Sequence, residues 1–164
     1  MLKPTAWLGG VLLVSAMSIL MASIAVAHEV KTEALRVAHP FATPTPPGAA
    51  NGAAYVDITA LSESVTLIGA SSPASSNVEL HDMRMDGDMM QMRHVDEIRV
   101  EAGETYTMRP GGGFHLMLIG LSEPLKEGER FPLTLTFAEQ DDVDIEVWIQ
   151  SAQEGSEAAD GHHH

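Results

Sequence analysis

Methionine is concentrated in one short polar stretch of the sequence, closed at each end by a histidine. The stretch His81–His94 reads HDMRMDGDMMQMRH, and five of its fourteen residues are methionine. These methionines alternate with Asp, Arg and Gln, whereas a methionine that fills a core has apolar neighbours. Thioethers are soft ligands that select Cu(I) over Zn²⁺, Mg²⁺ or Ca²⁺, and imidazole also suits copper. The stretch therefore favours a soft-metal site, although a stripe of methionines can also form an adaptable protein-binding surface.

A second pair of candidate ligands follows in the stretch Arg109–Met117, which reads RPGGGFHLM. His115 and Met117 are two residues apart, so on a strand their side chains point to the same face. The three glycines before them allow a sharp turn and a close approach to a neighbouring segment. No Lys-Ser or Lys-Thr follows the glycines, which argues against a phosphate-binding loop.

An extended backbone would bring the ligands of the first stretch together. Alternation puts two groups of three side chains on shared faces: His81, Met83 and Met85, then Met90, Met92 and His94. Between the groups, Asp86-Gly87-Asp88 is a strong hairpin-turn signal. We therefore expect a hairpin that gathers sulfur and imidazole groups at one end of the domain.

The rest of the chain has the pattern of an all-β domain. Apolar and polar residues alternate in short segments that turn residues interrupt, and no segment after residue 28 has a convincing helical period. The predicted strands include residues 55–61, 65–68, 105–109, 131–137 and 143–149. This pattern predicts a β-sandwich or small barrel. Tyr106 and Met108 are expected in the core, His39 in a structural or exposed role, and residues 40–52 in a fixed loop.

Residues 1–27 have the composition of a secretory signal peptide. A short basic start precedes an uncharged, apolar run that ends in Ala25-Val26-Ala27, the small-residue pattern that a signal peptidase accepts. An uncleaved membrane anchor is the alternative, because the run is long enough to span a bilayer. We expect cleavage before His28, a location in the periplasm and one domain over residues 28–150.

The tail, residues 151–164, is polar and acidic, and we expect it to be disordered. It ends in His162, His163 and His164, which are either a native metal-collecting tail or the stub of a purification tag.

The composition excludes several classes of protein. A formal net charge of -14 does not provide the basic surface that a nucleic-acid partner requires. Cysteine is absent, which excludes a blue-copper centre with its His and Cys ligands. Its absence also suits an oxidising compartment, where exposed thiols would form disulfides. No Ser-His-Asp, nucleophile-elbow or HExxH signature is present, so we do not expect an enzyme.

At the candidate ligands the chain resembles the periplasmic copper chaperones of the PCu(A)C type. The hallmark of that family is a histidine, a later methionine and then a His-x-Met pair. Here ten residues separate His81 from Met92, and twenty-two separate Met92 from His115, which forms His-x-Met with Met117. The flanking segments ELHDM, MQMRHV, RPGGGFHLMLIGL, PLKEGERFPLTLTF and HPFATPTPPGAANGAAYV also look like the family. The resemblance covers nearly the whole chain that follows the predicted cleavage site, and the second gap is slightly longer than the common form.

The resemblance implies an all-β, cupredoxin-like Greek-key β-sandwich with an accessible Cu(I) site made by His81, Met92, His115 and Met117. It implies delivery of copper to cytochrome c oxidase, with oxidase subunit II and a Sco-type thiol protein as partners and without catalytic turnover. We expect a monomer that meets the membrane only through these partners. A periplasmic copper-buffering or resistance protein that stores copper is the alternative, because the same ligands would serve it.

Further metal ligands lie outside that set. Met83, Met85, Met89 and Met90 exceed the motif and are either transient docking ligands or spares. After cleavage, the amine and imidazole of His28 would form a chelate that suits Cu(II). With the histidine tail this hints at a second, Cu(II)-preferring site, and an ordinary frayed terminus is the alternative.

Overall fold

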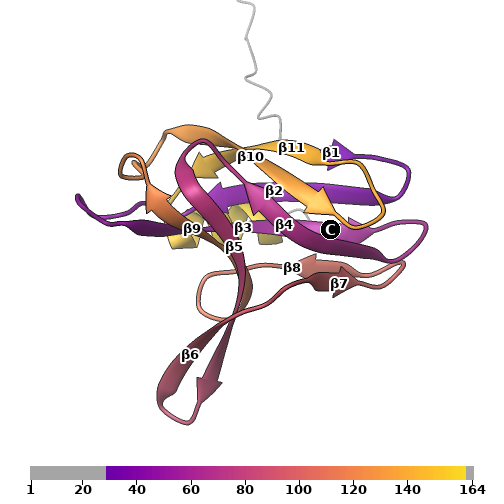
Figure 1. Cartoon of the computed structure of the whole chain (residues 1–164), viewed down its shortest axis with the longest axis horizontal. Helices are drawn as coiled ribbons and strands as arrows, with labels where there is room; N and C mark the ends of the chain where they lie inside the picture. Colours follow the sequence, from indigo (N-terminus) through magenta and orange to yellow (C-terminus); the bar gives the residue numbers. More distant parts are fainter. Residues whose placement is uncertain (1–28, 162–164) are drawn as a thin grey trace, which may run out of the picture.

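Seven strands pair in a ring that closes on itself in the computed structural model, which describes residues 29–161 (Figure 1). They are β2 (Leu35–Ala42), β3 (Asn51–Ala60), β4 (Val65–Ser71), β5 (Ser75–Asp86), β9 (Gly113–Leu121), β10 (Arg130–Phe137) and β11 (Val143–Ile149). The order is β2-β11-β10-β4-β5-β9-β3, and β3 pairs back with β2. Only the β2–β11 pairing in this ring is parallel. The predicted all-β sandwich or barrel is confirmed, and closure leaves the ring without an open edge.

Four shorter strands extend the ring. β1 (Val30–Lys31) pairs with β2, β6 (Met89–His94) with β5, β7 (Ile98–Val100) with β4, and β8 (Thr105–Thr107) with β3. The five predicted strand segments fall in β3, β4, β8, β10 and β11. The predicted loop is shorter than residues 40–52, because β2 continues through Ala42 and β3 begins at Asn51. The predicted signal peptide, His28 and the three terminal histidines lie outside the described residues.

The core fills the interior of the ring. Alternate residues of each strand face inward, as in β11, where Val143, Ile145, Val147 and Ile149 are buried and Asp144 is exposed. Met108 is fully buried, and Tyr106 packs against the core, as predicted. Each fully buried large apolar side chain stabilises the fold by roughly 1.5–3 kcal/mol.

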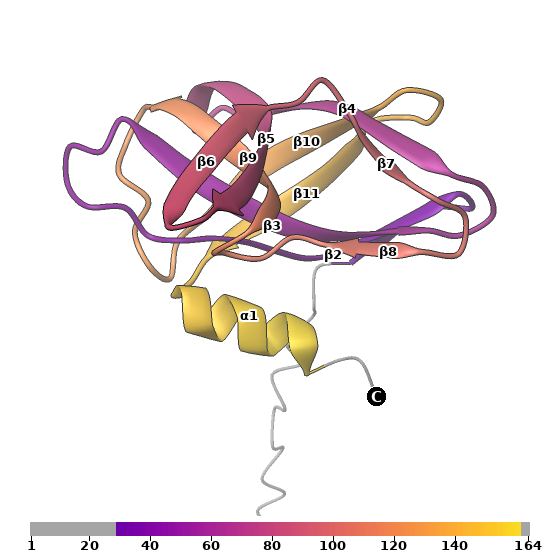
Figure 2. The same cartoon turned by 90° about the horizontal axis from the view of Figure 1, so that it is seen from below.

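The acidic tail is not disordered over its whole length, so that prediction was wrong. Helix α1 (Ala152–Asp160) begins with a capping box in which Ser151 and Glu154 satisfy each other's backbone N–H groups. It lies beside β2 (Figure 2), and Gly155 sits so close to the Phe41 ring that a Cβ atom there would overlap it. No helix within residues 29–161 is long and apolar enough to cross a membrane.

A buried ion pair anchors the loop that leads into β9. The Arg109 guanidinium donates to both carboxylate oxygens of Asp57, at 2.6 and 3.3 Å, and to Asp160 of α1 at 3.3 Å. Asp57 is 2% exposed. His39 also contacts it, with Nδ1 3.0 Å from Oδ2, and has a left-handed backbone with φ of 50°. The predicted structural role of His39 is therefore confirmed, and Arg109 holds the start of the glycine-rich loop.

We expect Arg109→Met to destabilise the protein by about 3–5 kcal/mol, because it leaves the buried Asp57 carboxylate without its charged partner. Arg99→Met is the matched control, since Arg99 pairs with Glu101 where both side chains are more than half exposed, and it should cost about 1 kcal/mol or less. Urea unfolding measures both changes. Equal losses in the two variants would show that the Asp57 pair does not have this role.

Candidate metal centre

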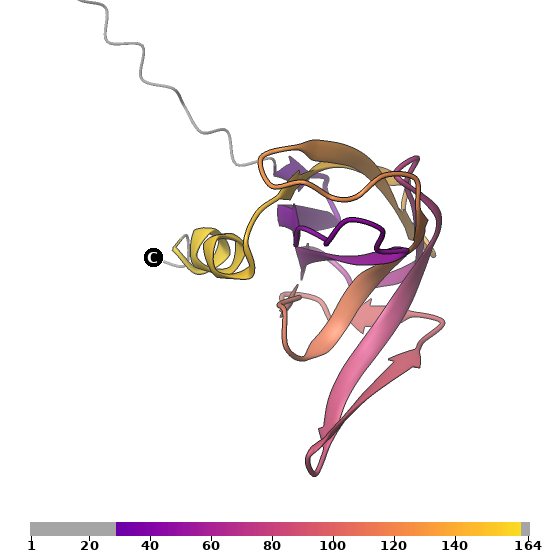
Figure 3. The ribbon, with the colours of Figure 1, turned by 90° about the vertical axis from the view of Figure 1, so that its left-hand side faces the viewer.

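The methionine-rich stretch forms a hairpin that projects from the ring (Figures 1 and 3). β5 and β6 pair antiparallel around the two-residue turn Gly87-Asp88. Gly87 has a φ of +62°, which a glycine at the first turn position adopts without strain. The register matches like with like: His81 with His94, Met83 with Met92, and Met85 with Met90. The predicted hairpin is therefore confirmed.

The two faces of this hairpin differ in chemistry. Register partners project to the same side of a sheet, so the three like pairs form one face, named the methionine face here. The other face is charged: the Asp82 carboxylate accepts a hydrogen bond from Arg84 Nε at 2.5 Å and lies 3.6 Å from Arg93. These contacts fix which way each strand faces, because a one-residue slip would exchange the two faces.

β9 continues the methionine face on the other side of β5. The register sets His115 opposite His81, Met117 opposite Glu79, and Gly113 opposite Met83. Leu116 and Leu118, which alternate with these residues, are fully buried in the core. The burial of the two leucines thus forces His115 and Met117 onto the outer face, as the spacing predicts.

The two histidines of the motif are neighbours. The ring centroids of His81 and His115 are 5.8 Å apart. Each ring has a buried Nδ1 atom with no hydrogen-bond partner among the described residues. The Nε2 atom of His81 lies 2.8 Å from a Glu79 carboxylate oxygen, which orients the ring and lowers the pKa of Glu79. A buried imidazole nitrogen without a partner is costly in a fold and is suited to bind a metal ion.

The two methionines of the motif lie on the same face but on either side of the histidine pair. Met117 lies two residues after His115 on β9, opposite Glu79 of β5. Met92 lies two residues before His94 on β6, opposite Met83 of β5, and so on the other side of the histidines. Met92 is 46% exposed. The structure thus brings His81 and His115 together and places Met92 and Met117 beside them on the same face, in opposite directions along the strands.

Three further side chains, outside the four-residue motif, lie beside the pair. His94 lies across from His81, with ring centroids 6.0 Å apart, and Met83 lies in the register step next to the pair, opposite the bare Gly113. Tyr55 packs 6.4 Å from the His115 ring on the side toward α1. Alternation and the predicted hairpin placed His94 and Met83 on this face in advance, whereas Tyr55 is brought there by long-range pairing.

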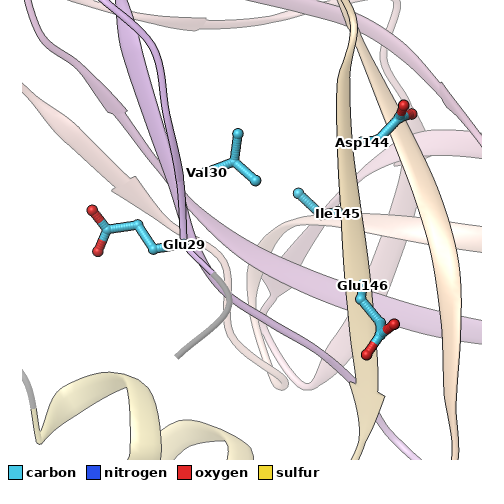
Figure 4. A pocket seen from close by; sticks show the side chains of 5 residues that line it. All are labelled: Glu29, Val30, Asp144, Ile145 and Glu146. Atoms are coloured by element: carbon cyan, nitrogen blue, oxygen red, sulfur yellow. The ribbon is translucent and has the colours of Figure 1, made fainter. Parts of the chain in front are cut away.

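The acidic and histidine side chains of the described residues do not form a cluster for a hard cation. Within residues 29–161, no three His, Cys, Asp or Glu side chains are grouped so that they could hold a metal ion. A pocket of about 310 Å³ lies between β1 and β11, away from the methionine face (Figure 4). Val30 and Ile145 line it, and the carboxylates of Glu29, Asp144 and Glu146 are engaged by Arg36, Thr134 and Arg130.

The stability of the metal-free protein should fall as the pH drops from about 7.5 through 6.5, the usual histidine pKa. Burial and the neighbouring His81 lower the pKa of His115 in the folded state. The unfolded chain therefore binds this proton more readily, and acid favours unfolding until the folded-state pKa is also passed. Urea midpoints across this range measure the slope, which His115→Gln should reduce. An unchanged slope in His115→Gln would contradict the prediction.

Comparison with known proteins places the chain in a family. Residues 35–149 match the family described as "Putative lipoprotein LpqE-like". A protein of Leifsonia xyli subsp. xyli (strain CTCB07), named "Putative lipoprotein Lxx21020", is 35% identical over 74 residues. That alignment covers 44% of this chain and 44% of the relative, so it spans less than half of the relative's length.

Solved structures share the fold. The copper-bound PCuAC domain from PmoF2 superposes with a TM-score of 0.65 and 22% identity, over 76% of this chain and 98% of that domain. CuI-DR1885 from Deinococcus radiodurans gives a TM-score of 0.57 and 26% identity, over 79% of this chain and 85% of that one. The predicted cupredoxin-like fold and the resemblance to the PCu(A)C family are confirmed. With residues 35–149 matched and the fold of PCuAC domains, the chain belongs to the LpqE-like family.

Proposed function

We propose that this protein is an exported copper chaperone that binds one Cu(I) ion with His81, Met92, His115 and Met117. The observation that supports it most is the pair of adjacent imidazoles on a face rich in methionine. Both have a buried Nδ1 atom without a hydrogen-bond partner in the described part of the chain. Two neutral imidazoles and two thioethers form a soft ligand set for Cu(I). The PmoF2 domain is copper-bound and DR1885 carries Cu(I), which supports the same ion here.

The exposure of Met92 favours delivery over storage, although His115 is only 3% exposed. Met92 is nearly half exposed and lies on β6, which among residues 29–161 pairs with β5 alone. Ligands at an exposed strand can be replaced one at a time by those of a recipient, whereas a storage site gains from being sealed. We propose that the recipient is the copper centre of cytochrome c oxidase subunit II, with a Sco-type thiol protein as a further partner.

Location and activity complete the proposal. The chain belongs to a family described as lipoprotein-like, which supports an exported protein. The location that we propose is the periplasm, after cleavage of a signal peptide. The copper ion is cargo, and the proposal assigns no catalytic turnover.

An anaerobic competition titration against a chromophoric Cu(I) chelator tests the site. We expect one tightly bound Cu(I) per chain, and a loss of affinity of more than about 100-fold when His115 and Met117 are both changed to Ala, because two ligands are removed. The control is Met89→Ala, which changes an exposed methionine on the charged face of the same hairpin. Equal binding by the double variant and the wild type would contradict the proposed ligand set.

Delivery is tested by mixing the Cu(I)-loaded protein with the metal-free soluble domain of oxidase subunit II. Copper is then measured on each protein after separation. Transfer within minutes supports delivery, and retention of the ion by the loaded protein supports the storage alternative.

A further inference from the structure

The hairpin has more thioethers than the proposed site uses. We propose that Met85 and Met90, the outermost like pair of the methionine face, form a second, weaker Cu(I) site through which the ion enters and leaves. This inference rests on the proposed function, because it supplies ions to the same histidine pair.

Cross-strand register places the two sulfurs within reach of one ion. Met85 and Met90 are direct partners in the antiparallel β5–β6 pair, and such partners have Cβ atoms about 4.5–5.5 Å apart on one face. A methionine side chain has three rotatable bonds, so two opposed thioethers can converge on a single ion. Two sulfur ligands make a weaker site than four mixed ones, which suits entry and exit.

The core does not account for this pair. Met85 is 60% exposed and Met90 is 58% exposed. The last register pair between β5 and β9 is Met83 with Gly113, so Met85 and Met90 lie beyond the end of β9. Large apolar side chains that remain in water on a projecting hairpin contribute little to stability.

The intervening pair connects the outer site to the histidines. Met83 and Met92 occupy the register step between Met85–Met90 and His81–His94. Successive same-face residues of a strand are about 6.6–6.8 Å apart, a distance that flexible thioethers can span from both sides. An ion could therefore move from the tip to the histidine pair by exchanging one thioether at a time, and it would remain Cu(I) throughout.

Methionine-methyl NMR with Ag(I), a soft ion that does not change oxidation state, tests the second site. Seven methionines follow residue 28: Met83, Met85, Met89, Met90, Met92, Met108 and Met117. The first equivalent of Ag(I) should shift the methyls of Met92 and Met117, and the second should shift those of Met85 and Met90. Met89 projects from the opposite face and Met108 is fully buried, so their methyls should stay in place.

Variants give the matched comparison. Met85→Leu combined with Met90→Leu should weaken the second Ag(I) equivalent by at least about tenfold and leave the first within about twofold. Met89→Leu, an equally exposed change on the charged face, should alter neither equivalent. Both changes keep the size and apolar character of the side chain, so the hairpin should remain folded.

The outcomes separate the two proposals. No response of Met85 and Met90 to a second equivalent overturns the second site and leaves the first intact; the methionine face would then be available for contact with a protein. An equal response of Met89 also overturns it, because it would show unspecific binding to any exposed thioether. Failure of Met92 and Met117 to respond to the first equivalent contradicts the proposed function instead.

Discussion

The register between β5 and β9 is the constraint on which the proposed metal centre depends. It sets His81 against His115 and at the same time buries Leu80 against Leu116 in the core. Side chains alternate along a strand, so a slip of one residue would move the leucines out of the core and turn the histidines toward it. The free energy of burying the leucines therefore keeps the imidazoles on the outer face. The site needs no separate force to assemble, because the core that stabilises the fold also positions the ligands.

Two further features act on this register. The Asp57–Arg109 ion pair fixes the start of the glycine-rich loop, and the loop sets where β9 begins. Gly113 is the first residue of β9 and lies opposite Met83. Because glycine has no side chain, the methionine face has none at this position of β9. The hairpin beyond β9 has only the β5–β6 pairing to hold it. The two histidines therefore lie on strands that are paired within the ring, whereas the methionines beyond β9 lie on the β5–β6 pair alone. This combination is suited to the exchange of a bound ion.

Sequence patterns predicted the local features of this arrangement well. The Asp86-Gly87-Asp88 signal located the hairpin, and two-residue spacing placed His115 and Met117 on one face, because both follow from short-range geometry. The partner of each strand outside a hairpin is a long-range property, so the contact of Tyr55 with His115 emerged only in the structure. Helix α1 was missed because its buried stripe contains only Gly155 and Ala159, and because its contact with Phe41 joins distant parts of the chain. The Ser151–Glu154 capping box was its one readable signal.

The central claim is that imidazole nitrogen and thioether sulfur bind the same Cu(I) ion. X-ray absorption at the copper edge, on protein loaded anaerobically with one equivalent of Cu(I), tests it most directly. A first coordination shell that contains both nitrogen and sulfur, and that loses nitrogen in His115→Ala, is the result we predict. A shell of sulfur alone in the wild-type protein would contradict the account, because copper would then occupy the methionines of the hairpin without the histidine pair.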